Sequence, residues 1–230
     1  LNEAGLGRAY DFSGNMNHGV NSGVTSTAGT YAGEFDGTDD YIVAPSNNIP
    51  TGSSAFSVSL WIKPTATTSG TPLWIGPESP SAGEAMVLYY DTTDSDRMRI
   101  GKWVGDNALR SAALTEGAWN HVVWTYAGGA GGALKVYTQT GGADEAADAS
   151  GTETFGIVAG KVVIGAAGNK TQDFNGSIAD VRIYASELSQ ANVTALAATN
   201  PTAAGVYPVI SGLEPVGWWK LGDAISANDT

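Results

Sequence analysis

The sequence feature that most constrains the fold is the segment at residues 55–64, AFSVSLWIKP. Its hydrophobic side chains alternate with a second, mostly polar set, and a period of two is typical of a β-strand. A proline closes the segment, because a residue without an N–H group cannot continue a ladder of hydrogen bonds. We predict a strand with Phe56, Val58, Leu60 and Ile62 facing a core and Ser57, Ser59, Trp61 and Lys63 on the other face.

Other short apolar runs, separated by turn residues, fill most of the chain. The 31 glycines and 9 prolines fit many turns, and Asp36-Gly37 is a strong hairpin signal between two strand-like runs at residues 31–43. About ten short strands with so little helix predict an all-β sandwich of two antiparallel sheets. The remaining predicted strands lie at residues 72–76, 85–91, 98–104, 109–114, 119–126, 134–138, 162–165 and 177–184.

One helix is predicted at residues 189–198, SQANVTALAA. Ser189 can cap its N-terminus, Val193, Leu196 and Ala197 form a short apolar stripe, and Pro201 stops it. We therefore expect one domain at residues 1–198, followed by a proline-containing linker at residues 199–215.

The last segment, residues 216–230, resembles the start of the chain. Leu221-Gly222-Asp223-Ala224 aligns with Leu1-Asn2-Glu3-Ala4, and the chain opens without a methionine. We expect a piece of a tandem array, in which this segment begins a further repeat or is a strand donated to a neighbouring copy. The expected protein partners are thus adjacent repeats or neighbouring subunits.

The charge of the chain limits its partners. The formal net charge is −12, with only 11 lysines and arginines, so double-stranded nucleic acid, which requires a basic surface, is excluded as a partner. Membrane insertion is not expected, because no apolar run has the length of a membrane span. There is no cysteine for disulfides or thiol chemistry. An acidic surface does suit the binding of hard cations.

Five blocks carry a resemblance to a known family. In chain order they are DFSGNMNHG, EFDGTDDYIVAP, FSVSLWIKP, GAWNHVVWTY and FNGSIADVRIYASELS. Together they resemble the laminin-G-like and pentraxin-like jelly rolls of the concanavalin A-like lectin/glucanase superfamily, over residues 1–197. The resemblance implies a jelly-roll sandwich, a structural Ca²⁺, a glycan-binding or adhesive role, and tandem copies.

The resemblance also implies where the Ca²⁺ would lie: the N-terminal loop, the FDG turn and the strand near the end. The turn has independent support, because three aspartates in five residues repel one another and Ca²⁺ takes six to eight oxygen ligands. The alternatives are a compact loop without an ion and a solvated turn. The candidate ligands in these two places are Asp11, Asn15, Asp36, Asp39 and Asp40.

Asp180 is the sixth candidate ligand. It lies between Ile178 and Val181 in an apolar strand, where a carboxylate without a partner would be costly. The alternative is that it caps a turn or pairs with Arg182.

Aromatic residues are the candidates for a glycan site, because sugar C–H faces stack on rings. The resemblance places the middle segments in the concave sheet of the fold, whereas Trp61, Trp119 and Trp124 lie in strong strands and are assigned to the core. Because Tyr89 and Tyr90 are adjacent in a strand, one of them must face away from the core. The glycan-binding candidates are Trp74, Tyr89, Tyr90 and Trp103.

Catalytic patterns are missing from the sequence. Laminarinase-type hydrolases of this superfamily carry E-x-D-x-x-E or E-x-D-x-E on one strand, and retaining hydrolysis needs two carboxyls about 5 Å apart. Neither pattern occurs. Of the two histidines, His121 is expected to pack in its strand. The sequence predicts a non-enzymatic module for glycan recognition or attachment, extracellular or on a cell or virion surface. The alternative is a structural spacer or decoration domain without a sugar ligand, and a hydrolase relative comes third.

Overall fold

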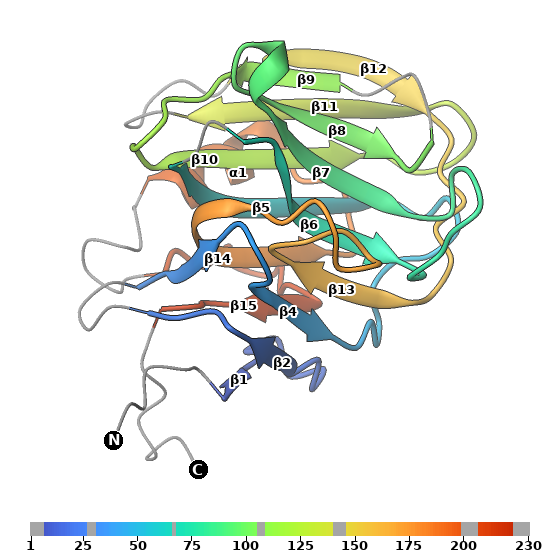
Figure 1. The fold of residues 1–230 in the computed structure, drawn as a ribbon. Coiled ribbons are helices and arrows are strands. Elements are labelled where there is room, and N and C mark those ends of the chain that lie inside the picture. The colour runs from blue at the N-terminus through green and yellow to red at the C-terminus, as the bar shows by residue number, and fades with distance from the viewer. Residues whose placement is uncertain are drawn as a thin grey trace, which may run out of the picture.

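The computed structural model describes residues 7–26, 31–65, 68–104, 109–139, 146–198 and 207–222. Its strands form two antiparallel sheets that face each other (Figure 1). One sheet has eight strands in the order β1-β2-β4-β13-β6-β7-β8-β9. The other has seven, in the order β12-β11-β10-β5-β14-β15, with β3 also paired to β14. The predicted all-β sandwich is confirmed.

The strands of the eight-stranded sheet are β1 (Arg8–Ala9), β2 (Gly19–Ser22), β4 (Tyr41–Ala44), β6 (Gly70–Gly76), β7 (Met86–Asp91), β8 (Arg97–Lys102), β9 (Leu109–Ala113) and β13 (Lys161–Ile164). The strands of the seven-stranded sheet are β3 (Gly33–Asp36), β5 (Phe56–Pro64), β10 (Asn120–Tyr126), β11 (Gly132–Gln139), β12 (Ala149–Glu153), β14 (Asn175–Tyr184) and β15 (Gly217–Trp219). A short 3₁₀ helix, η1 (Thr92–Asp94), joins β7 to β8, and the one α-helix among the described residues is α1 (Gln190–Ala197).

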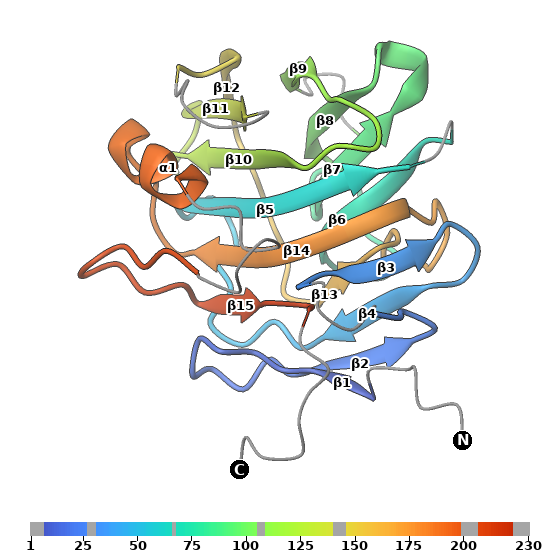
Figure 2. The same cartoon turned by 90° about the vertical axis from the view of Figure 1, so that its left-hand side faces the viewer.

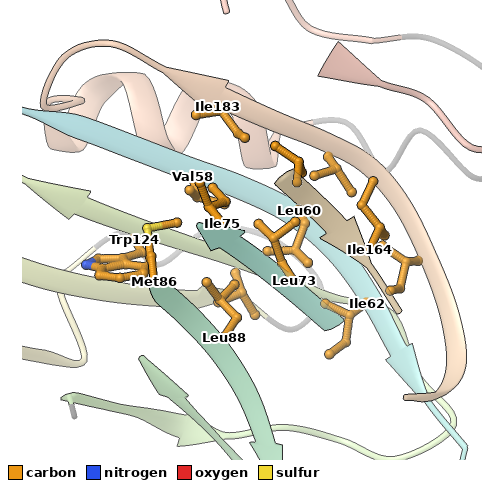
Figure 3. Packing of buried hydrophobic residues seen from close by; sticks show 14 of the residues in the cluster. Val58, Leu60, Ile62, Leu73, Ile75, Met86, Leu88, Trp124, Ile164 and Ile183 are labelled. Carbon is orange, nitrogen blue, oxygen red and sulfur yellow. The ribbon is translucent and has the colours of Figure 1, made fainter. Parts of the chain in front are cut away.

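Strand β5 lies in the interior of the seven-stranded sheet, between β10 and β14. The four hydrophobic residues of its alternation point between the sheets and pack on residues such as Leu73, Ile75, Leu88 and Trp124 (Figure 3). Each such side chain contributes about 1.5–3 kcal/mol when it is fully buried. The sheet-to-sheet core is therefore the main source of stability for the scaffold.

The second face of β5 is also buried, which the sequence did not predict. Ser57 is fully buried and binds the segment before the helix, because its Oγ donates to Ser186 O at 2.8 Å and accepts from Leu188 N at 2.9 Å. Trp61 packs there with Ala179. The outer face of the seven-stranded sheet is thus covered by other parts of the chain.

Helix α1 is part of this cover and confirms the predicted helix within one residue at each end. Ser189 caps it by accepting a hydrogen bond from Asn192 N at 3.2 Å. The helix lies outside the seven-stranded sheet (Figure 2). Its Val193 and Leu196 pack on Val123, Tyr137, Tyr184 and Leu188.

The tail forms a strand of this chain's own sheet. In β15, Gly217 pairs with Ile183 of β14 and Trp219 pairs with Val181, and Trp219 is fully buried in the core. In the described part of the expected linker, Ile210 and Leu213 pack against the cluster under α1. That the tail begins a further repeat, or is donated to a neighbour, stays a prediction. The expected linker at 199–206 and the end of the tail at 223–230 lie outside the described residues.

Strands β1, β2 and β12 were not predicted, because they are short and rich in polar residues or glycine. Among the described residues, no helix is long and apolar enough to cross a membrane.

Candidate functional site

The two adjacent tyrosines of β7 face opposite ways, as predicted. Tyr90 points into the core, is 1% exposed, and donates from its hydroxyl to Asp96 Oδ1 at 3.2 Å. Burial raises the pKa of the Tyr90 phenol. Tyr89 is half-buried on the outer face of the eight-stranded sheet, where it joins a second hydrophobic cluster. Only Tyr89 is therefore available to a ligand.

The two candidate tryptophans have different roles on the same face. Trp74 is 1% exposed, and its Nε1 donates to Pro77 O at 3.1 Å. The segment at Gly168 lies so close to it that a Cβ at that glycine would be 2.6 Å from the indole. Trp103 is half-buried and packs edge-on against Trp74, with ring centroids 5.1 Å apart. Trp74 therefore supports Trp103, and Trp103 presents the open ring.

An open pocket of about 250 Å³ lies on this face. Gly101 lies opposite Val87 in the β7–β8 pairing, so the absence of a side chain there deepens the pocket. The rings offer stacking surfaces, while Arg99 and Gln172 offer polar groups, which is the combination that sugar binding requires. The lining residues are Val87, Tyr89, Arg99, Gly101, Lys102, Trp103, Val104 and Gln172.

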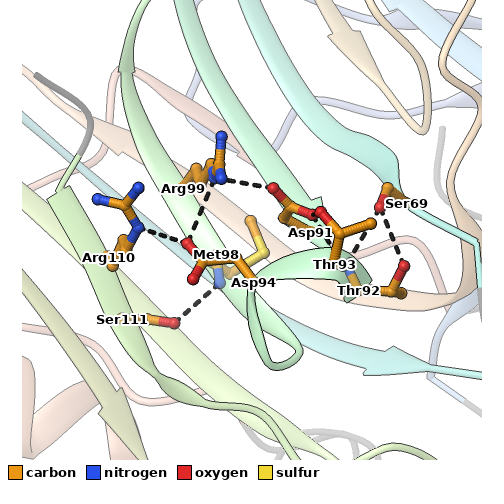
Figure 4. Close-up of polar contacts among 9 residues, drawn as sticks. All are labelled: Ser69, Asp91, Thr92, Thr93, Asp94, Met98, Arg99, Arg110 and Ser111. Atoms are coloured by element: carbon orange, nitrogen blue, oxygen red, sulfur yellow. Dashed lines mark hydrogen bonds and ion pairs between the residues drawn. The ribbon is translucent and has the colours of Figure 1, made fainter. Parts of the chain in front are cut away.

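Arg99 is held at the pocket by a network of acids (Figure 4). Its Nε lies 2.8 Å from Asp91 Oδ2 and 3.4 Å from Asp94 Oδ2. Asp91 also caps η1, and Arg110 Nε donates to Asp94. The hydrogen bond from Arg110 lowers the pKa of Asp94. The guanidinium is thus positioned before any ligand arrives.

Sequence reasoning missed Arg99 and Gln172. The signal for Arg99 was present, because Arg97, Arg99 and Gly101 alternate with the buried Met98 and Ile100 along β8. Gln172 gave no signal, since it comes from a loop between β13 and β14.

A second site is formed by the turn between β3 and β4. One carboxylate oxygen each of Asp36, Asp39 and Asp40 lies within 4.8 Å of the other two. Asp36 and Asp39 are exposed, whereas Asp40 is 8% exposed. Asp40 Oδ2 accepts from Asp36 N at 2.9 Å, and Asp36 Oδ1 accepts from Thr38 N at 2.8 Å. We call these three residues the acidic triad.

The electrostatics of the acidic triad fit a cation. Burial raises the pKa of Asp40, as do the negative charges of Asp36, Asp39 and Asp173, while the hydrogen bond from Asp36 N opposes the shift. Burial also raises the pKa of Asp173, whose buried Oδ1 accepts no hydrogen bond from the described residues. A hard cation would relieve this repulsion, and carboxylate oxygens are the ligands that Ca²⁺ prefers.

The acidic triad does not include Asp11, and that Asp11 and Asn15 bind Ca²⁺ stays a prediction. Asp11 accepts from Ser13 N, Ser13 Oγ, Asn17 N and Trp218 N at 2.8–2.9 Å. Asn15 Nδ2 donates to Val216 O at 3.0 Å. These side chains hold β15 because the loop that carries them lies beside that strand.

The triad does not include Asp180 either. Asp180 pairs with Arg182, as the stated alternative has it, and its role as a Ca²⁺ ligand stays a prediction. Its Oδ1 accepts from Arg182 Nε at 2.7 Å and from Trp218 Nε1 at 2.7 Å. The guanidinium lies 4.6 Å from the centroid of the Trp218 ring. Asp180 is 2% exposed, and this burial raises its pKa while Arg182 and Trp218 oppose the rise.

His121 is buried, and this burial lowers its pKa to about 3, so the imidazole is neutral at physiological pH. Its Nε2 lies 2.8 Å from Ser59 Oγ, and its ring lies 4.9 Å from the Trp61 ring. This histidine is therefore buried between the seven-stranded sheet and the segments that cover its outer face.

Three solved structures illustrate the similarity of the fold. Domain 4 of the extracellular arabinanase AbnA of Geobacillus stearothermophilus, in complex with arabinotriose, has a TM-score of 0.63 and 22% identity over 85% of this chain and 100% of that one. The heptameric SAP-like pentraxin of Limulus polyphemus has a TM-score of 0.54 and 16% identity over 81% and 93%. A putative carbohydrate-binding protein of Bacteroides ovatus has a TM-score of 0.51 and 19% identity over 83% and 58%.

A search of curated protein sequences found no match. The family model of the concanavalin A-like lectin/glucanases superfamily matches residues 36–194. This range covers most of the sandwich, including both the pocket and the acidic triad. The chain belongs to the concanavalin A-like lectin/glucanases superfamily.

Proposed function

We propose that the chain is a non-enzymatic module that recognises a glycan through the pocket at Trp103. The observation that carries the proposal is the half-buried Trp103 ring beside Tyr89, with a pre-positioned Arg99 at the same pocket. A ring that is supported from behind by Trp74 loses little conformational freedom when a sugar stacks on it.

The shape and lining of the pocket narrow the type of ligand. A volume of about 250 Å³ is smaller than a typical enclosed ligand site, so the pocket suits the end or one unit of a saccharide. Among the described residues, no carboxylic acid lines the pocket, whereas glycoside hydrolysis requires two. Binding without cleavage is therefore the favoured activity.

Two of the similar structures suggest which class of ligand to test first. The AbnA domain was solved with arabinotriose, and the Bacteroides ovatus protein is described as carbohydrate-binding. We extend that ligand class to this chain and place the module outside the cell or on a cell or virion surface, where polysaccharides are available.

The test is a glycan array in calcium buffer that includes arabino-oligosaccharides, followed by titration calorimetry of the best ligand. Trp103→Ala should weaken binding roughly two- to tenfold, because the stacking contact of one ring is worth about 0.5–1.5 kcal/mol. Tyr89→Ala should weaken it as well. Tyr10→Ala removes an exposed aromatic ring that does not line this pocket and serves as the matched control.

Two outcomes would contradict the proposal. If the wild type binds no glycan, the spacer or decoration role takes its place. If Trp103→Ala and Tyr10→Ala bind equally well, the glycan site lies elsewhere.

We also propose that the acidic triad, with Asp173, binds a structural Ca²⁺. The support is the cluster of carboxylates together with the raised pKa values of Asp40 and Asp173. The ion would tie the β3–β4 turn to the end of the loop before β14. Calorimetric titration of metal-free protein with CaCl₂ should give one site per chain in the wild type and a much weaker one in Asp39→Asn. A metal-free wild type that produces no binding heat would overturn this assignment.

A further inference from the structure

Two segments from opposite ends of the described chain form one structural unit. We call residues 11–17 the clasp loop and residues 216–222, which include β15, the closing strand. We propose that the closing strand is exchangeable, so that the slot between the clasp loop and β14 accepts the closing strand of a second copy of this chain. This proposal does not depend on glycan or calcium binding.

The slot binds the backbone of the closing strand on both sides. On the β14 side, Val216 N donates to Ile183 O at 2.7 Å and Asp180 N donates to Lys220 O at 3.2 Å. On the other side, Phe12 N donates to Trp218 O at 2.8 Å. The segment is therefore held as a strand is held inside a sheet.

Side chains of the clasp loop add contacts that a simple sheet edge lacks. Asp11 Oδ1 accepts from Trp218 N at 2.9 Å. Ser13 Oγ and Asn15 Nδ2 both donate to Val216 O, at 3.2 and 3.0 Å. In the opposite sense, Trp219 Nε1 donates to Asn17 O at 2.9 Å. The block DFSGNMN is therefore a receptor for a strand.

The inward side of the slot is selective for particular residues. Trp219 and Leu221 are 0% and 5% exposed in the core. A Cβ at Gly217 would lie 2.7 Å from the Trp219 ring, and a Cβ at Gly222 would lie 1.7 Å from Tyr31 backbone. The clash at Gly217 is with Trp219 of the same strand, whereas the slot itself leaves no room for a side chain at residue 222 and buries Trp219 and Leu221.

On the outward side of the closing strand, aromatic rings contact cationic side chains. The Trp218 ring lies over Arg182 at 4.6 Å. Lys220 Nζ lies 4.0 Å from the Phe12 ring centroid and 4.8 Å from that of Tyr207. The contact between Lys220 and Phe12 is a cation–π contact that joins the closing strand to the clasp loop.

The contacts within the slot would be the same whichever copy supplies the segment. A vacated slot would expose the edge of β14 and a hole of tryptophan size, and unpaired sheet edges bind further strands. Exchange of an identical element is a low-cost route to dimers. The similarity of Leu221-Gly222-Asp223-Ala224 to Leu1-Asn2-Glu3-Ala4 favours a second copy as the source of the strand.

The experiment refolds full-length chains that carry two different affinity tags. The two populations are unfolded in denaturant, mixed, refolded together at high concentration and purified on both tags in sequence, and the mass is measured by light scattering. We expect a dimer that carries both tags. Populations that are refolded separately and then mixed should give no such dimer at short times.

Variants tie the dimer to the slot. Trp219→Ala removes the main anchor of the donor, so Trp219→Ala mixed with itself should lose the two-tag dimer. Trp219→Ala mixed with wild type should give the two-tag dimer in a smaller amount than wild type mixed with itself, because only one of the two exchanged strands keeps its anchor. Val209→Ala, at a 65% exposed residue, is the matched control and should behave as wild type. Only monomers in the wild-type mixture, or an undiminished dimer from Trp219→Ala alone, would overturn the proposal.

Discussion

Asp180 and the acidic triad show two different ways in which a folded chain holds carboxylates. Asp180 is 2% exposed and has a cation and an indole N–H within 2.7 Å. The triad holds three carboxylates within 4.8 Å of one another, and none of the ion pairs among the described residues involves them. The sequence suggested one joint site, but a paired acid and a cluster of unpaired acids respond oppositely to substitution and to metal.

The largest effect should come from Asp180→Ala. It leaves the buried Arg182 without its counter-charge, which typically costs about 3–5 kcal/mol. Urea unfolding in excess chelator should show this loss in the free energy of unfolding. A double variant, Asp180→Leu with Arg182→Leu, should recover most of the loss, because no buried charge is left unpaired. A loss below about 1 kcal/mol for the single variant would mean that the pair is solvated.

Asp40→Asn should stabilise the protein in calcium-free buffer, in contrast to Asp180→Ala. Burial and the neighbouring acids raise the pKa of Asp40 above its unfolded value, so the native state binds the proton more tightly than the unfolded state. Its contribution to stability is then present below the unfolded pKa and is lost as pH rises through the folded pKa. Melting temperatures in chelator should be higher for the variant than for wild type at pH 7.

The pH dependence of the same melting temperatures checks that the stabilisation comes from the charge of Asp40. The difference between Asp40→Asn and wild type should shrink as the pH falls through the raised pKa of Asp40, because the wild-type carboxyl then becomes protonated. A variant that melts below wild type at pH 7 without calcium would show that the ionised Asp40 stabilises the turn.

The smallest effect should come from Glu78→Gln. Lys170 Nζ lies 2.7 Å from Glu78 Oε1, and this hydrogen bond lowers the pKa of Glu78. The Glu78 side chain is 63% exposed, so solvent screens the pair and its loss should not be measurable in urea unfolding. A clear loss would show that the pair fixes the loop between β13 and β14 beside Trp74.

The features of the fold that depend on local sequence patterns could be predicted from the sequence. The alternation along Phe56–Pro64 identified strand β5, and Ser189 identified the start of the helix. The adjacent Tyr89 and Tyr90 had to face opposite sides of the sheet. In each case the signal lies within one element, where the backbone period decides which side chain is buried.

The remaining features depend on contacts between distant residues. Asp11 was proposed as a metal ligand because it lies among Asn and Gly, but its partner Trp218 is 207 positions away. The cost of an unpaired Asp180 was recognised, yet the indole that shares its carboxylate comes from the same distant strand. The three aspartates of one turn, which are close in sequence, do lie together in the structure.

The central claim is that the acidic triad, and not Asp180, holds the calcium. It is tested most directly by calorimetric melting of metal-free wild type, Asp39→Asn and Asp180→Asn, each with Ca²⁺ or with excess chelator. At a Ca²⁺ concentration about 100 times the dissociation constant, binding adds about 2.7 kcal/mol, or roughly 5–10 °C in Tm for a chain of this size. We predict this rise in wild type and in the less stable Asp180→Asn, and its loss in Asp39→Asn. An unchanged wild-type Tm on chelation, or a rise that Asp39→Asn keeps and Asp180→Asn loses, would contradict the account.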